Sequence, residues 1–212
     1  MELLGELSRT EKIEGSAISF LPPRSLFRNF LRDRNVASIC GSSHYAVQAV
    51  CNQIDFSTAN RIVEFGPGTG ALTFPLLARM KGNARLIAFE TNLSLANSLA
   101  RTVTDPRLNV FNDSAEYIDG VCSKPGCRAD VVISGIPFSL MNPDTVETII
   151  SKTMSAVSPG GRFIIYQAWL PPLFSTKSLQ RRLRNYFTIK SVGRVLLNFP
   201  PLEIITCLRS VS

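Results

Sequence analysis

Three glycines spaced two residues apart mark the strongest candidate site in the sequence. Gly66, Gly68 and Gly70 follow a short apolar run, Arg61 to Phe65, and precede a helical stretch. Glycine has no side chain to keep a ligand from the backbone, and the first N–H groups of a helix have no partner within it. The pattern therefore predicts a small polar ligand over this turn.

Carboxylates stand at the ends of three successive predicted strands. Glu64 lies two residues before the first glycine, where it can reach an α-amino group directly or through water. Glu90 ends the second strand and is placed to accept both ribose hydroxyls, and Asp113 follows the third strand, facing an adenine amino group. The glycines alone also fit a dinucleotide fingerprint, and a single acid is more often a helix cap. Together, the three acids favour a nucleoside that bears an amino acid.

The elements that must position these residues alternate between β-branched runs and helical stretches, which is typical of a parallel sheet with crossover helices. The predicted strands are residues 61–65, 85–90, 108–111, 130–134 and 161–167. Helices are expected to begin near Gly70, Asn92, Ser114 and Pro143.

The end of the chain breaks this alternation. Two strand-like runs, 189–197 and 203–209, are separated only by Asn198-Phe199-Pro200-Pro201. So short a link cannot hold a helical crossover, so the two runs should pair antiparallel. The prediction is an α/β protein with a seven-stranded, mostly parallel sheet and a C-terminal antiparallel hairpin. Residues 1–52 are expected to form a helical extension before the main domain, 53–212.

These features together resemble the class I S-adenosylmethionine-dependent methyltransferases, which have a Rossmann-like sheet ending in the same antiparallel pair. The resemblance covers about residues 60 to 212. It implies that S-adenosyl-L-methionine is the cofactor. The residues implied to bind it are Glu64, Gly66, Gly68, Gly70, Glu90, Thr91, Asp113, Ser114 and Ser134.

The segment after the fourth strand is where such enzymes bring the methyl acceptor to the cofactor. Amino-directed enzymes of nucleic acids often have an Asn-Pro-Pro-Tyr type motif there, whereas this chain has Ser134-Gly135-Ile136-Pro137. A Gly-Leu-Pro motif at this position belongs to the bacterial phospholipid N-methyltransferases. Further similarity to that family, from an amphipathic helix at Ser25–Leu31 to Asn198-Phe199-Pro200-Pro201, extends over about residues 25 to 206.

The resemblance implies methylation of a phospholipid headgroup amine, converting phosphatidylethanolamine to its mono-, di- or trimethylated forms. The alternatives are an rRNA adenine or small-molecule amine methyltransferase on the same fold, or a non-catalytic membrane or nucleotide-binding protein. Methyl transfer depends mainly on positioning and desolvation. Candidate catalytic residues are Ser134, Gly135, Tyr166 and His44. A lone histidine such as His44 is more often a surface residue, and Tyr166 can hold a methylated ammonium by cation–π attraction.

The chain is basic, with a net charge of +7 over 212 residues, so an anionic partner is expected. Arg24, Arg28 and Arg32 lie on one face of a predicted helix whose other face includes Phe27 and Phe30. Such a helix suits an anionic membrane surface, although a core-packed helix with a solvated basic face is the commoner use of the pattern. A second basic segment, 177–190, has no acid. RNA binding is disfavoured because these segments offer few aromatic residues for base stacking.

Location and metal content can also be predicted. No apolar run reaches the roughly 18 residues that a membrane-spanning helix needs, and the N-terminus has acids where a signal peptide needs basic residues. We expect a cytoplasmic protein peripheral to the inner face of the membrane. The closest cysteines, Cys122 and Cys127, lack the spacing of a zinc site, so no metal is expected.

Overall fold

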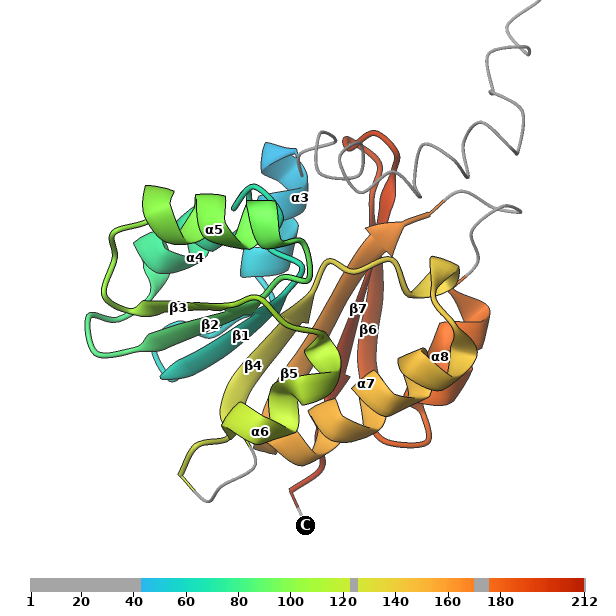
Figure 1. Cartoon of the computed structure of the whole chain (residues 1–212). Coiled ribbons are helices and arrows are strands. Elements are labelled where there is room, and N and C mark those ends of the chain that lie inside the picture. Colours follow the sequence, from blue (N-terminus) through green and yellow to red (C-terminus); the bar gives the residue numbers. More distant parts are fainter. Residues whose placement is uncertain (1–42, 123–125, 170–175, 212) are drawn as a thin grey trace, which may run out of the picture.

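The computed structural model describes residues 43–122, 126–169 and 176–211. Its centre is a seven-stranded sheet with the strand order β3-β2-β1-β4-β5-β7-β6 (Figure 1). The strands are β1 (Arg61–Phe65), β2 (Arg85–Phe89), β3 (Leu108–Phe111), β4 (Ala129–Ser134), β5 (Val157–Ala168), β6 (Thr188–Val195) and β7 (Leu202–Leu208). The first five strands pair in parallel, and β7 lies antiparallel between β5 and β6.

Helices cover both faces of the sheet (Figure 1). One face has α3 (His44–Cys51), α4 (Thr73–Arg79) and α5 (Leu93–Thr102), and the other has α6 (Ile118–Cys122), α7 (Pro143–Ala156) and α8 (Lys177–Leu183). Two short 3₁₀ turns, η1 (Ala115–Tyr117) and η2 (Phe138–Leu140), follow β3 and β4. Because parallel strands end at the same edge, the loops after β1 to β5 gather at one edge of the sheet.

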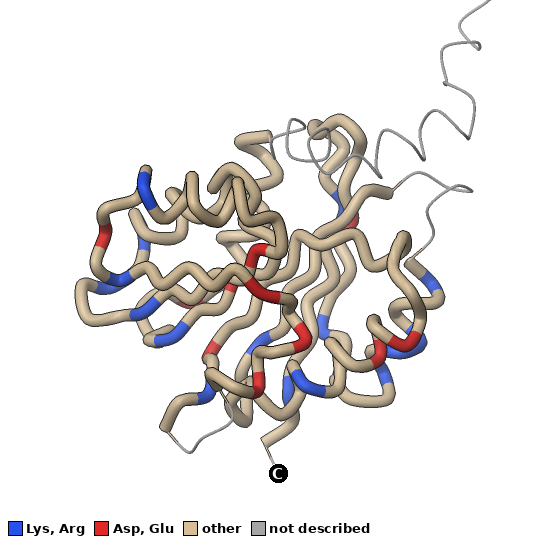
Figure 2. The backbone as a smooth tube through the Cα atoms, in the orientation of Figure 1, with Lys and Arg blue, Asp and Glu red and all other residues tan. Residues whose placement is uncertain are grey.

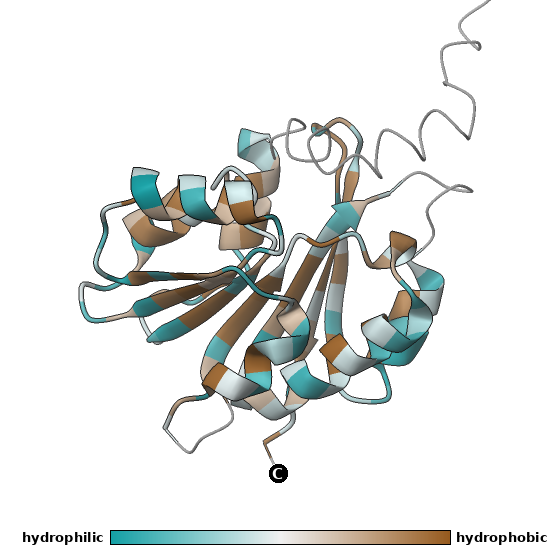
Figure 3. Ribbon diagram, viewed as in Figure 1, coloured by the Kyte–Doolittle hydropathy of each residue, from teal (hydrophilic) through white to brown (hydrophobic). Residues whose placement is uncertain are grey.

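Alternating side chains of the central strands build two separate cores. Ile62 of β1 packs with the α3–α5 layer, and Val63 and Phe65 pack with the α6–α8 layer. The strands are accordingly apolar through the middle of the molecule (Figure 3). Glu64 is the exception: an acid fully buried on the same face as Ile62. A charged residue in a core strand is costly, which points to a function.

Local capping fixes where the helices begin. The side chain of Asn92 accepts from the N–H groups of Ser94 (3.0 Å) and Leu95 (3.2 Å) at the start of α5. Asn142 caps α7 in the same way through Asp144 N–H (2.8 Å), and Pro143 occupies the first helical position. These caps place both helices directly after loops at the carboxyl edge of the sheet.

The predicted fold class is confirmed. The predicted helical crossovers and the antiparallel pairing of the last two runs are present. The last strand, β7, lies next to β5, so β6 forms the edge of the sheet. The helix α8 was not predicted, because the basic segment that contains it was read only by its charge. Leu179 and Leu183, one turn apart, bury its inner face.

Most of the predicted N-terminal extension lies outside the described residues. This includes the residues expected to contact a membrane, Arg24, Phe27, Arg28, Phe30 and Arg32. The last helix of that extension, α3, packs into the α3–α5 core through Val47 and Val50. Within the described ranges, no helix is long and apolar enough to cross a membrane. The same residues contain no cluster of three or more His, Cys, Asp or Glu side chains suited to a metal ion.

Candidate cofactor and acceptor site

The turn after β1 has a backbone that requires glycine. Gly66, Gly68 and Gly70 have φ angles of 69°, 57° and 89°, which side chains strongly disfavour. A Cβ atom on Gly66 would lie 2.9 Å from Cγ2 of Ile136, so the turn also packs closely against the loop after β4. The two loops that should flank a bound cofactor are thus in direct contact.

Glu64 is a buried acid with an unused oxygen. Its Oε2 accepts a hydrogen bond from Thr73 Oγ1 (2.8 Å), and its Oε1 has no hydrogen-bond partner among the described residues. Burial raises the pKa of Glu64 to about 7, against the smaller lowering effect of the Thr73 hydrogen bond. A buried carboxylate that lacks a partner is stabilised by a cation. An α-ammonium group therefore fits this position.

Glu90 connects the glycine turn to the end of β2. Its Oε2 accepts from Gly68 N–H (3.2 Å) and its Oε1 accepts from Asn92 N–H (2.8 Å). Each carboxylate oxygen has further lone pairs, so the group can still accept two vicinal hydroxyls. Thr91, the next residue, is exposed.

Asp113 and Ser114 form the loop after β3. Asp113 is exposed and its Oδ1 accepts from Ser114 N–H (2.8 Å), while Ser114 Oγ donates to Glu116 Oε2 (3.0 Å). The neighbouring Asn112 donates from Nδ2 to the backbone oxygen of Glu90 (2.8 Å), which ties this loop to the previous one. Acidic positions gather here in the middle of Figure 2.

Two contributors to this half of the site were missed in the sequence. Thr73 holds Glu64, and Asn112 joins the loops after β2 and β3. Both are small polar residues beside predicted strand ends. Their types are common at helix starts and turns, so only the folded contacts distinguish them.

The predicted acceptor side lies at the ends of β4 and β5. Ser134 is fully buried and its Oγ has no hydrogen-bond partner within the described ranges. Its neighbour in the sheet is Ile165, so the next residues, Gly135 and Tyr166, lie side by side. A Cβ atom on Gly135 would collide with the phenolic oxygen of Tyr166 and lie 2.7 Å from its Cζ. The Tyr166 side chain occupies the space that any larger residue at 135 would need.

His44 lies at the exposed start of α3, where its ring contacts that of Tyr45. The residue before it, Ser43, donates its backbone N–H to Oδ1 of Asn198 (2.8 Å). These contacts connect the start of α3 to the β6–β7 loop rather than to the glycine turn. A role for His44 remains a prediction.

The residues fit S-adenosylmethionine on two observations. The glycine turn admits a ligand against its backbone, and Glu64 presents an orphaned buried oxygen to a cation. Glu64 would hold the amino group, Glu90 the ribose and the Asp113 loop the adenine. When bound, the cofactor supplies a methyl group on a positively charged sulfur.

Comparisons with known proteins show similarity to methyltransferases. Residues 24–119 match the family model described as ribosomal RNA adenine dimethylase. The structure resembles that of the N-methyltransferase NodS from Bradyrhizobium japonicum WM9 in complex with S-adenosyl-l-homocysteine. The TM-score is 0.65 at 12% identity, covering 88% of this chain and 97% of that one. This chain has the fold of the class I S-adenosylmethionine-dependent methyltransferases.

Curated relatives of this chain have two kinds of acceptor in their names. A ribosomal RNA small subunit methyltransferase A from Alcanivorax borkumensis is 29% identical over 55% of this chain and 37% of its own length. Another, from Geobacter metallireducens, is 26% identical over 85% of this chain and 68% of its own. An ornithine lipid N-methyltransferase from Singulisphaera acidiphila is 23% identical over 81% of this chain and 88% of its own. This chain spans only about two fifths of the length of the first curated rRNA relatives.

Proposed function

We propose that this methyltransferase transfers methyl groups to the amine of a lipid headgroup, with phosphatidylethanolamine as the acceptor. The observation that carries this proposal is the contact between Gly135 and Tyr166. The Asn-Pro-Pro-Tyr type of motif ends in a proline and an aromatic residue, which correspond to Pro137 and Phe138. Aligned on this pair, the motif spans Gly135 to Phe138, and its asparagine corresponds to Gly135. The Tyr166 side chain fills the space that an asparagine there would need.

The missing asparagine changes what the acceptor side can bind. An asparagine amide offers both a donor and an acceptor, which suits the edge of a base. A tyrosine ring beside a glycine instead offers an aromatic face and a hydroxyl. Such a face attracts an ammonium group, and it continues to do so as methyl groups replace hydrogens. The geometry suits an aliphatic amine better than an adenine.

The extents of the similarities leave room for a lipid acceptor. The match to the rRNA family model ends at residue 119, before β4, so it covers the cofactor loops and not the acceptor loop. The ornithine lipid N-methyltransferase aligns over 81% of this chain and 88% of its own length. The rRNA methyltransferase from Geobacter metallireducens also aligns over 85% of this chain, so these extents alone do not separate the two acceptors.

The chain's own residues position the acceptor nitrogen for an in-line displacement. In this step the N–C bond forms as the C–S bond breaks, and the nitrogen must have lost its proton beforehand. In this proposal Ser134 Oγ, which has no hydrogen-bond partner among the described residues, accepts an N–H, and Tyr166, beside Gly135, stabilises the cation that results. Catalysis then consists of orientation and exclusion of water.

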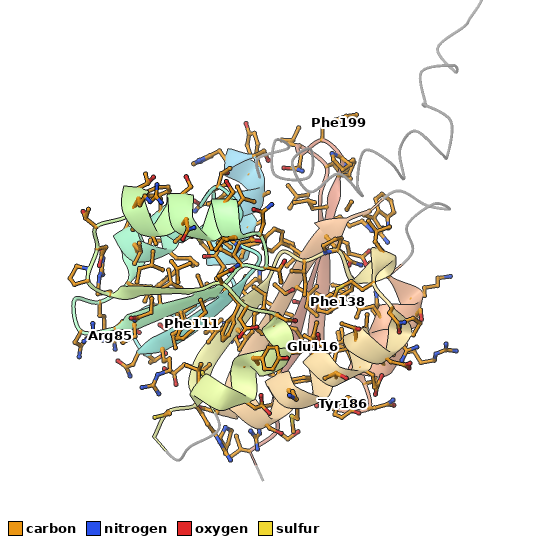
Figure 4. The ribbon with its side chains drawn as sticks, viewed as in Figure 1. Arg85, Phe111, Glu116, Phe138, Tyr186 and Phe199 are labelled. Carbon is orange, nitrogen blue, oxygen red and sulfur yellow. The ribbon has the colours of Figure 1, made fainter. Side chains whose placement is uncertain are left out.

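The proposal includes docking on an anionic membrane surface, with the enzyme peripheral to the cytoplasmic face. The described residues add a candidate contact to the predicted helix that contains Arg24, Phe27, Arg28, Phe30 and Arg32. Leu196, Leu197 and Phe199 in the β6–β7 loop are 67%, 65% and 83% exposed. Figure 4 shows Phe199 at the tip of this hairpin. Three large apolar side chains at one exposed tip suit insertion into a lipid interface.

Mass spectrometry of lipids provides the test. The full-length protein is incubated with S-adenosylmethionine and vesicles of phosphatidylethanolamine mixed with an anionic lipid. We expect products heavier by one, two or three methyl groups. Absence of methylated lipid from a preparation that binds S-adenosylmethionine in calorimetry would contradict the proposal.

Methylation of rRNA adenine is the second candidate, and the match over residues 24–119 favours it. It is tested in parallel with unmethylated small ribosomal subunits as the acceptor. Labelled subunits without labelled lipid would establish this function in place of the lipid reaction.

A further inference from the structure

A pocket of about 250 Å³ lies beside the acceptor loop, on the α6–α8 side of the sheet. Its wall begins at Phe138, three residues after Gly135, and continues into α7 and α8. Figure 4 shows Phe138 near the ends of β4 and β5. The apolar lining residues are Phe138, Met141, Pro143, Val146 and Leu179.

The pocket has one buried polar group with an unused acceptor. Gln167 is only 6% exposed and lines the pocket, and its Oε1 has no hydrogen-bond partner among the described residues. An unpaired buried amide oxygen destabilises the fold, and a hydrogen bond from a ligand N–H would remove that cost. By the sheet register, Gln167 lies one residue beyond Tyr166, level with Ile136.

The neighbouring buried acid shows the contrast. Glu203, paired with Gln167 across β5 and β7, is also buried, but both of its oxygens accept hydrogen bonds. Thr176 and Gln180 donate to Oε1, and Arg194 Nε donates to Oε2 (3.3 Å). Gln167 is thus the unsatisfied member of an otherwise completed polar cluster.

The pocket also contains a guanidinium with donors to spare. Arg182 lines it and donates from Nη1 to Glu147 Oε2 (2.9 Å), an ion pair that also fixes the side chain. Glu147 is held from the other side by Tyr186 Oη (2.8 Å), and these two hydrogen bonds lower its pKa. A guanidinium has five N–H donors, so Arg182 can bind a phosphate or carboxylate without leaving Glu147.

We infer that this pocket binds the acceptor headgroup as a zwitterion, an inference that rests on the proposed function. Arg182 binds its anionic group, a phosphodiester or carboxylate, and Gln167 Oε1 accepts an N–H from its amine. The volume lies below the roughly 300–1,000 Å³ of pockets for drug-sized ligands, so it holds a headgroup and leaves acyl chains outside. Gln167 is a specificity-determining residue for an amine placed a few bonds from an anion.

The test separates the two contacts with three soluble probes, phosphoethanolamine, ethanolamine and inorganic phosphate. Their binding to the protein saturated with S-adenosylhomocysteine is measured by ligand-observed NMR titration. Arg182→Gln should weaken the binding of phosphoethanolamine and of phosphate by about tenfold or more, and should change the binding of ethanolamine by less than about twofold. Gln167→Met should weaken the binding of phosphoethanolamine and of ethanolamine several-fold and leave the binding of phosphate unchanged.

Matched variants exclude general charge and folding effects. Arg181→Gln removes the same charge from an exposed position of the same helix and should change nothing. Gln167→Glu keeps an acceptor oxygen and should retain ethanolamine binding, which mere damage to the fold would not. Thermal unfolding and S-adenosylhomocysteine binding of each variant provide the folding control. Equal effects of Arg181→Gln and Arg182→Gln, or unchanged binding in Gln167→Met, would overturn the inference.

Lipid kinetics identify the source of the anion and separate this inference from the proposed function. Phosphatidylethanolamine and ornithine lipid are presented in otherwise identical vesicles. If Arg182→Gln raises the KM for one of these lipids about tenfold and changes kcat little, the pocket binds the headgroup of that lipid. If no lipid is methylated but the probes follow the expected pattern, the lipid function fails and the zwitterion site stands. If lipid is methylated and Gln167→Met leaves KM and probe binding unchanged, the site fails and the function stands.

Discussion

The two halves of the sheet use their buried polar groups differently. On the cofactor side, Glu90 receives hydrogen bonds from Gly68 and Asn92, and Glu64 Oε1 is a buried oxygen without a partner among the described residues. On the acceptor side, Ser134 and Gln167 both present oxygens without partners among the described residues. The cofactor loops are thus largely pre-organised by their own contacts, whereas the acceptor side has unsatisfied groups that await a ligand. Damage to the first half should abolish cofactor binding, and damage to the second should change the acceptor.

The largest effect is expected from Gly135→Asn. The new side chain would collide with Tyr166, and a displacement of about 1 Å near the reacting atoms is enough to cost roughly 100-fold in rate. We expect lipid methylation to fall by that factor while S-adenosylmethionine binding, measured by calorimetry, is retained. Gly82→Asn is the matched control, because a Cβ there meets nothing within 4 Å. Full activity in Gly135→Asn would remove the basis for excluding an asparagine-type acceptor site.

The next effect is the pH dependence of cofactor binding through Glu64. Burial raises the pKa of this acid to about 7, so the folded protein holds a proton there that the unfolded chain releases near pH 4.5. The charged form is needed to pair with an ammonium group, so affinity should rise with pH, by about eightfold between pH 6 and 7.5. Glu64→Gln should bind more weakly and lose this rise. Calorimetry at the two pH values measures both, and an unchanged pH profile in the variant would assign the titration elsewhere.

The same raised pKa predicts a stability change of defined sign. Ionisation of buried Glu64 is unfavourable in the folded protein, so its contribution to stability is fully present below about pH 4.5 and is lost as pH rises through about 7. Without cofactor, Glu64→Gln should therefore gain stability relative to the natural chain on going from pH 5 to pH 8. Chemical denaturation at these pH values gives the comparison. A constant difference between the two proteins would show that Glu64 does not titrate in this range.

An effect on membrane binding, and not on cofactor binding, is expected at the exposed hairpin tip. Replacing Leu196, Leu197 and Phe199 by serine removes apolar area that would enter a lipid interface, and should weaken vesicle binding by about tenfold or more. Binding of soluble phosphoethanolamine should be unaffected because the tip is outside the pocket. Val211→Ser alters an equally exposed apolar residue near the C-terminus and serves as the control. Vesicle sedimentation that does not distinguish the two variants would exclude the tip as a contact.

The cofactor half was largely predictable from the sequence because its residues are local in the chain. The glycines and Glu64 lie within one strand and turn, and Glu90 and Asp113 are recognisable by their places at successive strand ends. Because the carboxyl ends of parallel strands lie at the same edge of the sheet, predicting the sheet is enough to predict that these residues lie close together. The hydrogen bond from Gly68 to Glu90 shows that two of these predicted elements meet.

The acceptor half was harder to predict because its contacts join distant segments. Gln167 in an apolar strand and Arg182 in a basic stretch have no recognisable spacing, and they meet only because β5 and α8 lie against the same loop. The close approach of Tyr166 to Gly135, which leaves no space for a side chain at position 135, likewise depends on the register of β4 with β5. The sequence prediction considered only the charge of segment 177–190. It therefore missed the helix α8, which is recognisable by its two buried leucines, Leu179 and Leu183.

One competition experiment tests the lipid acceptor most directly. The protein is given S-adenosylmethionine with a labelled methyl group, phosphatidylethanolamine vesicles containing anionic lipid, and unmethylated small ribosomal subunits in the same reaction. Extraction then separates labelled lipid from labelled RNA. We predict that the label appears in the lipid fraction and is lost from it in Gly135→Asn. Label confined to the RNA fraction would contradict the lipid function and establish an rRNA acceptor instead.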